Sequence, residues 1–155
     1  MFIKPDQLIL LVEDSPEDYH ATLRSFRRAH LANSIYHCED GESALDYLHQ
    51  RGDFAEGAKA PRPGLILLDL NLPGTDGYAV LRDIKQDESL ASIPVIVLTM
   101  STDEHDIQAC YRAGANGYVK KPVDLDGFIQ ALGRLADYWF QIVVLPQGDQ
   151  IRAAD

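Results

Sequence analysis

Five short apolar runs, each followed by an amphipathic segment, limit the possible folds of this chain more than any other feature. The runs cover residues 8–12, 34–38, 65–69, 94–99 and 116–120. Continuous apolar runs of this length are typical of strands that are buried on both faces. Their alternation with helical segments predicts an α/β fold, in which a five-stranded parallel sheet lies between two layers of helices.

The segments between the runs carry the signals that begin and end helices. Ser15 is suited to cap a helix, with Pro16 in the first helical position and Asp18 three residues after the cap. Acidic residues open the fourth helix, and Gly114 is a natural C-cap for it. The apolar stripes expected to face the sheet are Tyr19, Leu23 and Phe26; Ala44, Leu45 and Leu48; Val80, Leu81 and Ile84; and Leu125, Phe128, Ile129, Leu132, Leu135, Ala136 and Trp139.

The length of 155 residues predicts one domain, over residues 1–140, followed by a short tail. Segment 51–63 is polar and rich in Gly and Pro, so we expect it to be a surface loop. The tail, 141–155, continues an apolar stretch that a single helix cannot wholly bury. Such a stretch predicts contact with a second copy or another protein, and the alternative is that it packs on the fifth helix.

Charge and cysteine content narrow the class of protein. The net charge of −10 repels nucleic acid and anionic lipid, so neither is an expected partner. Cys38 and Cys110 have neither metal-ligand spacing nor the density of a disulfide scaffold, and we expect both to be small buried hydrophobes. The first apolar run is too short to cross a bilayer and has no cleavage site, which predicts a cytoplasmic protein.

Polar side chains gather at the carboxyl ends of the predicted strands, where open α/β sheets bind their ligands. Glu13 and Asp14 follow the first strand, and Asp69 ends the third. Three carboxylates so close together resist ionisation unless a positive charge joins them, and oxygen ligands suit Mg²⁺. Thr99 and Lys121, at two further strand ends, add a hydroxyl and an ammonium group that suit a phosphoryl oxygen.

Four motifs in this order resemble the receiver domains of two-component response regulators. They are ILLVEDSPED, LILLDLNLPGTDGY, IPVIVLTMS and GANGYVKKPVD, which together cover about residues 7–137. The resemblance implies a flavodoxin-like, doubly wound (βα)5 three-layer sandwich with strand order 2-1-3-4-5. The end of the chain and the loop over residues 51–63 make it most similar to the small stand-alone regulators that are paired with bacterial and cyanobacterial phytochromes.

The resemblance also implies a role for each residue at the strand ends. Asp69 is the implied phosphoacceptor, and Glu13, Asp14, Asp69 and the backbone carbonyl of Asn71 are the implied ligands of Mg²⁺ or Mn²⁺. Thr99 and Lys121 would contact the phosphoryl group.

Two further features follow from the same resemblance. Thr99 and Tyr118 would form the switch, and the Lys121–Pro122 peptide bond would be cis.

Simpler interpretations stand beside several of these roles. Asp14 can belong to a helix cap, Thr99 can be an ordinary β-branched strand residue, and Lys121 can be a solvated surface charge. Met100 stands where the family mostly has a small residue. A side chain that points at the site would slow phosphorylation or hydrolysis, whereas an outward one would only fill a gap.

The implied function is that of a single-domain response regulator, which accepts a phosphoryl group from a sensor histidine kinase such as a phytochrome. Transfer and later dephosphorylation are self-catalysed, so the protein is not a conventional enzyme. Its output would be protein contacts, in a homodimer and with a downstream partner. The predicted interface consists of Tyr138, Trp139, Phe140, Ile142, Val143 and Leu145.

Two other classes of function compete with this one. A binding module that acts without phosphorylation, with constitutive dimer contacts, remains an alternative. An aspartate-based phosphatase is disfavoured, because Asn71 stands where such an enzyme needs a second aspartate.

Overall fold

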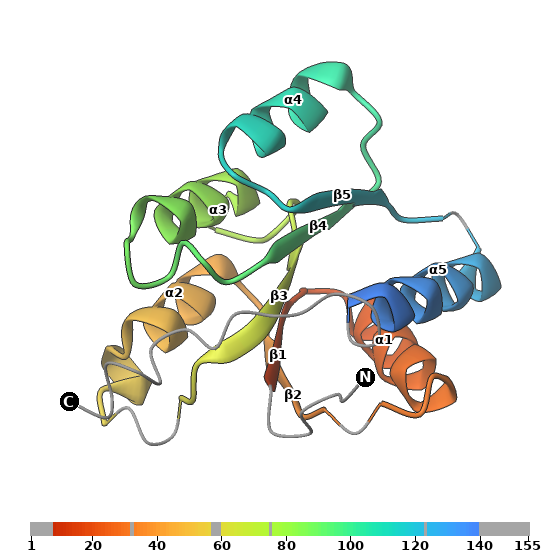
Figure 1. The fold of residues 1–155 in the computed structure, drawn as a ribbon, viewed down its shortest axis with the longest axis horizontal. Helices are drawn as coiled ribbons and strands as arrows, with labels where there is room; N and C mark the ends of the chain where they lie inside the picture. The colour runs from red at the N-terminus through yellow and green to blue at the C-terminus, as the bar shows by residue number, and fades with distance from the viewer. Residues whose placement is uncertain (1–7, 32, 57–59, 75, 123, 140–155) are drawn as a thin grey trace.

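One parallel sheet of five strands forms the centre of the molecule (Figure 1). The computed structural model describes residues 8–31, 33–56, 60–74, 76–122 and 124–139. The strands are β1 (Leu8–Val12), β2 (Ile35–Cys38), β3 (Pro63–Asp69), β4 (Val95–Thr99) and β5 (Gly117–Lys120). Their order in the sheet is β2-β1-β3-β4-β5, so the predicted fold and strand order are confirmed.

Helices cover both faces of this sheet. As Figure 1 shows, α1 (Pro16–Arg28) and α5 (Leu125–Asp137) lie side by side on one face. On the other face lie α2 (Gly41–His49), α3 (Gly77–Gln86) and α4 (Glu104–Arg112). A short 3-10 turn, η1 (Gly52–Phe54), follows α2. Each of α1 to α4 connects two parallel strands, as a parallel sheet requires, whereas α5 follows the last strand.

Strand residues alternate between two apolar cores, one on each face. Ile9 and Leu11 of β1 pack beneath α1 and α5, whereas Leu10 and Val12 pack on the side of α2, α3 and α4. All four side chains are at most 1% exposed. Burial on both faces explains why the sequences of the central strands β1, β3 and β4 are largely apolar rather than alternating.

The residues predicted to begin and end helices are confirmed at α1 and α4. The Ser15 hydroxyl accepts a hydrogen bond from the Asp18 N–H at 3.2 Å, as a helix cap does. Gly114 follows the end of α4 with φ of +106°, a left-handed conformation that favours glycine. The predicted inward stripes are confirmed only in part. Leu125, the first residue of α5, is 49% exposed, and Leu23 is half-buried and belongs to neither apolar core.

The segment between α2 and β3 is more closely tied to the core than a simple surface loop. Phe54 packs edge-on against Tyr47, with ring centroids 5.1 Å apart, and Ala60 is only 2% exposed. The Tyr47 hydroxyl donates a hydrogen bond to the Pro61 carbonyl at 2.7 Å. Tyr47 was not among the residues expected to face inward, although it is 1% exposed.

One backbone expectation is wrong. No peptide bond among the described residues is cis, so the Lys121–Pro122 bond is trans. The trans isomer is the more stable one for most X–Pro bonds, and Lys121 reaches its carboxylate partners from it. In the described ranges, no helix has both the length and the apolar character that crossing a membrane requires.

Candidate functional site

Three carboxylates meet at the carboxyl edge of the sheet. Glu13 and Asp14 follow β1, and Asp69 ends the neighbouring strand β3, which pairs with β1 in register. One oxygen of each lies within 4.8 Å of the others. Glu13 and Asp69 are buried, at 2% and 5% exposure, whereas Asp14 is exposed. The sequence therefore predicted both the residues of this cluster and their convergence.

Lys121 supplies the positive charge that this cluster needs. Its Nζ donates hydrogen bonds to Glu13 Oε1 at 2.7 Å, Asp18 Oδ2 at 2.8 Å and Asp69 Oδ2 at 3.0 Å. The side chain is 7% exposed, so the interpretation of Lys121 as a solvated surface charge is wrong. An ammonium group has three N–H donors, and these three carboxylates use all of them.

The electrostatics of the cluster show an excess of negative charge. Burial, followed by the hydrogen bond to Asp69, raises the pKa of Glu13 to about 8, although Lys121 opposes the shift. Burial alone would lower the pKa of Lys121, but its hydrogen bonds to Asp18 and Glu13 outweigh burial and raise the pKa above its ordinary value. The lysine therefore stays charged, whereas the surroundings of Glu13 disfavour the ionised form of its carboxyl.

The same groups fit a hard divalent cation. Carboxylate oxygens are the ligands that Mg²⁺ and Mn²⁺ prefer, and three of them converge here. The exposed Asp14 leaves one side of the cluster open to solvent, which suits an ion that keeps several of its waters. A cation would also balance the charge that Lys121 leaves uncompensated.

Two further predicted residues border the cluster. The backbone N–H of Asn71 donates to Asp69 Oδ1 at 3.0 Å, so the loop after β3 folds back onto the carboxylate. Thr99 ends β4 at 1% exposure, and its hydroxyl accepts the Ser101 N–H at 3.2 Å. A cavity of about 300 Å³ opens beside Thr99 and Asn71 and is lined also by residues of α4.

Tyr118 and Met100 lie near this rim, on β5 and after β4. The Tyr118 hydroxyl donates to the Ser101 carbonyl at 2.9 Å, and burial raises the pKa of Tyr118. Met100 is 51% exposed, so much of its side chain lies in solvent. The effect of Met100 on reaction rates stays a prediction.

Sequence reasoning missed a second layer of contacts around the cluster. Asp18 was interpreted only as a capping position, yet its carboxylate turns to Lys121. Its place in a helix, where many acids are solvated, gave no signal of this contact. The His37 Nε2 lies 2.6 Å from the Glu13 carbonyl and must donate to it, while the His37 ring stacks on Tyr19 at 4.0 Å. No sequence motif marks His37.

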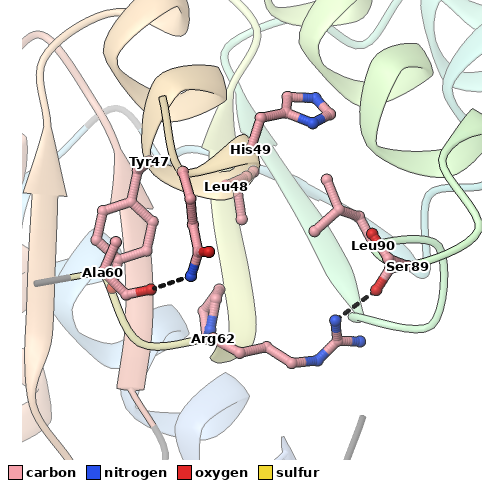
Figure 2. Close-up of a pocket in the computed structure, with 9 residues that line it drawn as sticks. Tyr47, Leu48, His49, Ala60, Arg62, Ser89 and Leu90 are labelled. Atoms are coloured by element: carbon pink, nitrogen blue, oxygen red, sulfur yellow. Dashed lines mark hydrogen bonds between the residues drawn. The ribbon is translucent and has the colours of Figure 1, made fainter. Parts of the chain in front are cut away.

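A second cavity, of about 240 Å³, lies at the opposite edge of the sheet (Figure 2). Its lining includes Tyr47, His49 and Arg62, close to Pro63 at the start of β3. Pro63 and Asp69 are the two ends of β3, and six residue steps along a strand span about 20 Å. Figure 2 shows the guanidinium of Arg62 donating to the Ser89 carbonyl, so Arg62 braces the loop after α3. This cavity is separate from the acidic cluster.

Part of the predicted interface lies at the end of α5. Tyr138 is 52% exposed, and the ring of Trp139 meets it edge-on with centroids 5.7 Å apart. Trp139 also packs against the core beneath α1 and α5. Phe140, Ile142, Val143 and Leu145 lie outside the described residues.

Comparison with known proteins gives a family match over most of the chain. The model of the response regulator receiver domain matches residues 9–133. Response regulator Rcp1 of Synechocystis sp. is 38% identical over 142 residues, which span 92% of this chain and 95% of Rcp1.

Solved structures agree with this match. The Mn²⁺-bound form of Rcp1 superposes with a TM-score of 0.85 at 38% identity, over 90% of this chain and 99% of that one. The phosphorylated cyanobacterial phytochrome response regulator RcpA gives a TM-score of 0.86 at 37% identity, over 92% and 99% of the two chains.

Proposed function

This chain belongs to the response regulator receiver domain family, and we propose that it works by accepting a phosphoryl group on Asp69. The observation that carries the proposal is the buried Asp69 carboxylate, held 3.0 Å from the Lys121 ammonium beside two further acids. A buried carboxylate at a strand end is unfavourable unless its surroundings use it. The phosphorylated form of the relative RcpA supports a role in accepting a phosphoryl group.

In the proposed reaction, one oxygen of Asp69 attacks the phosphorus of a phosphohistidine, and the bond from phosphorus to the histidine nitrogen breaks. Lys121 and the Thr99 hydroxyl then contact the phosphoryl oxygens and stabilise their charge. Glu13, Asp14, Asp69 and the Asn71 carbonyl would hold Mg²⁺ or Mn²⁺, which neutralises charge on the transferred group. The Mn²⁺-bound form of Rcp1 supports a divalent ion.

The signal would pass from Thr99 to Tyr118. We propose that the Thr99 hydroxyl moves toward the phosphoryl group and that the Tyr118 ring follows it inward. The cavity of about 300 Å³ next to Thr99 offers space for such a rearrangement. Tyr118 would give up its hydrogen bond to the Ser101 carbonyl in this step.

The proposed partners are a sensor histidine kinase, a second copy of this chain and a downstream protein, all in the cytoplasm. The description of RcpA as a phytochrome response regulator makes a phytochrome the first kinase to test. Dimer contacts would involve Tyr138, Trp139, Phe140, Ile142, Val143 and Leu145. The exposed aromatic ring of Tyr138 at the end of α5 supports this surface.

The proposal is tested with a small phosphodonor. The protein is incubated with Mg²⁺ and acetyl phosphate, and its intact mass is measured over time. We expect one added phosphoryl group on the native protein and none on Asp69→Asn. If neither acetyl phosphate nor a histidine kinase adds a phosphoryl group to the native protein, the proposal is wrong and a binding module that needs no phosphorylation replaces it.

A further inference from the structure

Lys121 has no free N–H group in this structure. Its three donors are shared among Glu13, Asp18 and Asp69, at 2.7, 2.8 and 3.0 Å. To contact a phosphoryl oxygen, the ammonium must therefore release at least one of these carboxylates. Which partner it keeps decides where its other N–H groups point.

The three partners differ in what cation binding and phosphorylation do to them. Glu13 and Asp69 belong to the group of carboxylates whose oxygens lie within 4.8 Å of one another, and Asp69 is the proposed phosphoacceptor. Asp18 is not in that group, although it lies among the residues that the structure describes. A cation would thus bind Glu13 and Asp69, and a phosphoryl group would be attached to Asp69. Asp18 would keep its hydrogen bond to Lys121.

The position of Asp18 is fixed by a helix rather than by a loop. Its N–H donates to the Ser15 hydroxyl at 3.2 Å, and its carbonyl accepts the hydroxyl of Thr22 at 2.8 Å. Thr22 is 1% exposed, so this turn of α1 is held against the core. A carboxylate on such a rigid element can orient a flexible lysine side chain.

We propose that Asp18 is a positioning residue for the phosphoryl site: it holds one N–H of Lys121 and so aims the other N–H groups at a phosphoryl group on Asp69. This inference rests on the proposed function. It adds a residue of α1 to a site otherwise made of strand ends and the loops after them. Asp18 acts through Lys121 and does not itself touch the reacting atoms.

Beryllofluoride, a stable mimic of the phosphoryl group on aspartate, provides the test. Its affinity in saturating Mg²⁺ is measured by fluorine NMR for the native protein, Asp18→Ala and Asp18→Asn. We expect about tenfold weaker binding for Asp18→Ala, the effect of one lost charge-assisted hydrogen bond. Asp18→Asn keeps an oxygen acceptor at the same place and should bind within about threefold of the native protein.

Glu17→Ala is the matched control. Glu17 is an exposed acid in the same helical turn, so this variant removes the same charge without touching Lys121. Its affinity for beryllofluoride should equal that of the native protein. The nitrogen-15 resonance of the Lys121 ammonium, recorded without any metal, gives a second readout that does not depend on phosphorylation activity. We expect this resonance to shift and broaden in Asp18→Ala but to stay sharp in Asp18→Asn.

The outcomes separate this inference from the proposed function. If the native protein binds beryllofluoride and Asp18→Ala matches it in affinity and in the lysine resonance, the role of Asp18 is wrong. The proposed function is unaffected by that result. An Asp18→Asn variant as weak as Asp18→Ala also overturns the role of Asp18, since charge rather than orientation would then matter. Native protein that neither binds beryllofluoride nor takes up a phosphoryl group overturns both.

Discussion

At the scale of single residues, the cluster of carboxylates at the sheet edge has a large effect on the pKa of Glu13. Glu13 is 2% exposed and shares one ammonium with Asp18 and Asp69. Burial and the hydrogen bond to Asp69 raise the pKa of Glu13 from 4.5 to about 8. A raised pKa in an acid means that the folded protein disfavours the charged form, so ionisation of Glu13 weakens the fold.

The metal-free protein should therefore lose stability as Glu13 ionises. Below pH 4.5 this carboxyl is protonated in both the folded and the unfolded state. Between pH 4.5 and about 8 only the unfolded state is ionised, so the free energy of unfolding falls by at most about 1.4 kcal/mol per pH unit. In Glu13→Gln no carboxyl ionises at this position, so this fall in the free energy of unfolding is absent. In urea titrations with EDTA, the stability of this variant relative to the native protein should rise between pH 5 and 8, and a constant difference would contradict the raised pKa.

The site residues that the sequence revealed are those at the ends of apolar strands. Asp69 and Lys121 were predictable because a charge that ends or follows a buried run is unusual and because the carboxyl ends of parallel strands meet. Asp18 was not, because it lies in a helix where many acids are solvated. Only the fold brings α1 beside the loop after β5 and turns this carboxylate to Lys121.

At the scale of elements, Lys85 ties α3 to the start of two strands. Its Nζ donates to the carbonyls of Ala91 at 2.9 Å and Ile93 at 2.8 Å, and to Asn116 Oδ1 at 3.0 Å. The same Asn116 oxygen accepts the N–H of Val95 at 2.9 Å. The lysine thus holds the connection from α3 to β4 against the turn before β5. Lys85 is half-buried, and this burial lowers the pKa of its ammonium group because it disfavours the charged form.

Lys85→Met should destabilise the fold by about 2 kcal/mol. It keeps the side-chain stem but removes the ammonium donor from the Ala91 and Ile93 carbonyls, and it leaves Asn116 Oδ1 with only the Val95 N–H. The free energy of unfolding in urea measures the effect. Lys120→Met removes an exposed lysine from the end of β5 and should change stability by less than about 0.5 kcal/mol. Equal stabilities of the two variants would show that the Lys85 contacts contribute nothing.

The elements themselves were largely predictable. All five strands and the apolar stripe of α3 (Val80, Leu81 and Ile84) follow from periodicity, because buried faces must be apolar. The packing of Phe54 on Tyr47 could not be predicted from the sequence. The composition of segment 51–63 is typical of loops and gives no sign of an aromatic contact. Periodicity also overextended the inward stripe of α5 to Leu125, the helix end where a side chain has no sheet beneath it.

At the scale of the whole molecule, the order of strands decides which residues can form a site. Neither periodicity nor composition orders the strands, and the order 2-1-3-4-5 came from the family resemblance. With β1 between β2 and β3, the acids after β1 lie beside Asp69.

The proposed dimer is a prediction at this scale. Sedimentation velocity over a range of protein concentrations should show a shift from monomer to dimer. A chain that ends at Asp137 removes all six predicted interface residues, and we expect it to sediment as a monomer at every concentration. Leu125→Ala, which removes an exposed apolar side chain at the other end of α5, is the control. A truncated chain that still dimerises would place the interface elsewhere.

The central claim is that Asp69 carries the phosphoryl group, and mapping the modified residue tests it most directly. The protein is phosphorylated with acetyl phosphate and Mg²⁺, reduced with borohydride and digested, and the peptides are sequenced by mass spectrometry. Reduction converts an aspartyl phosphate to homoserine and leaves free carboxylates unchanged. We predict homoserine at position 69 alone, in a fraction that matches the phosphoryl group seen by intact mass. Homoserine at another aspartate, with Asp69 unchanged, would contradict the account.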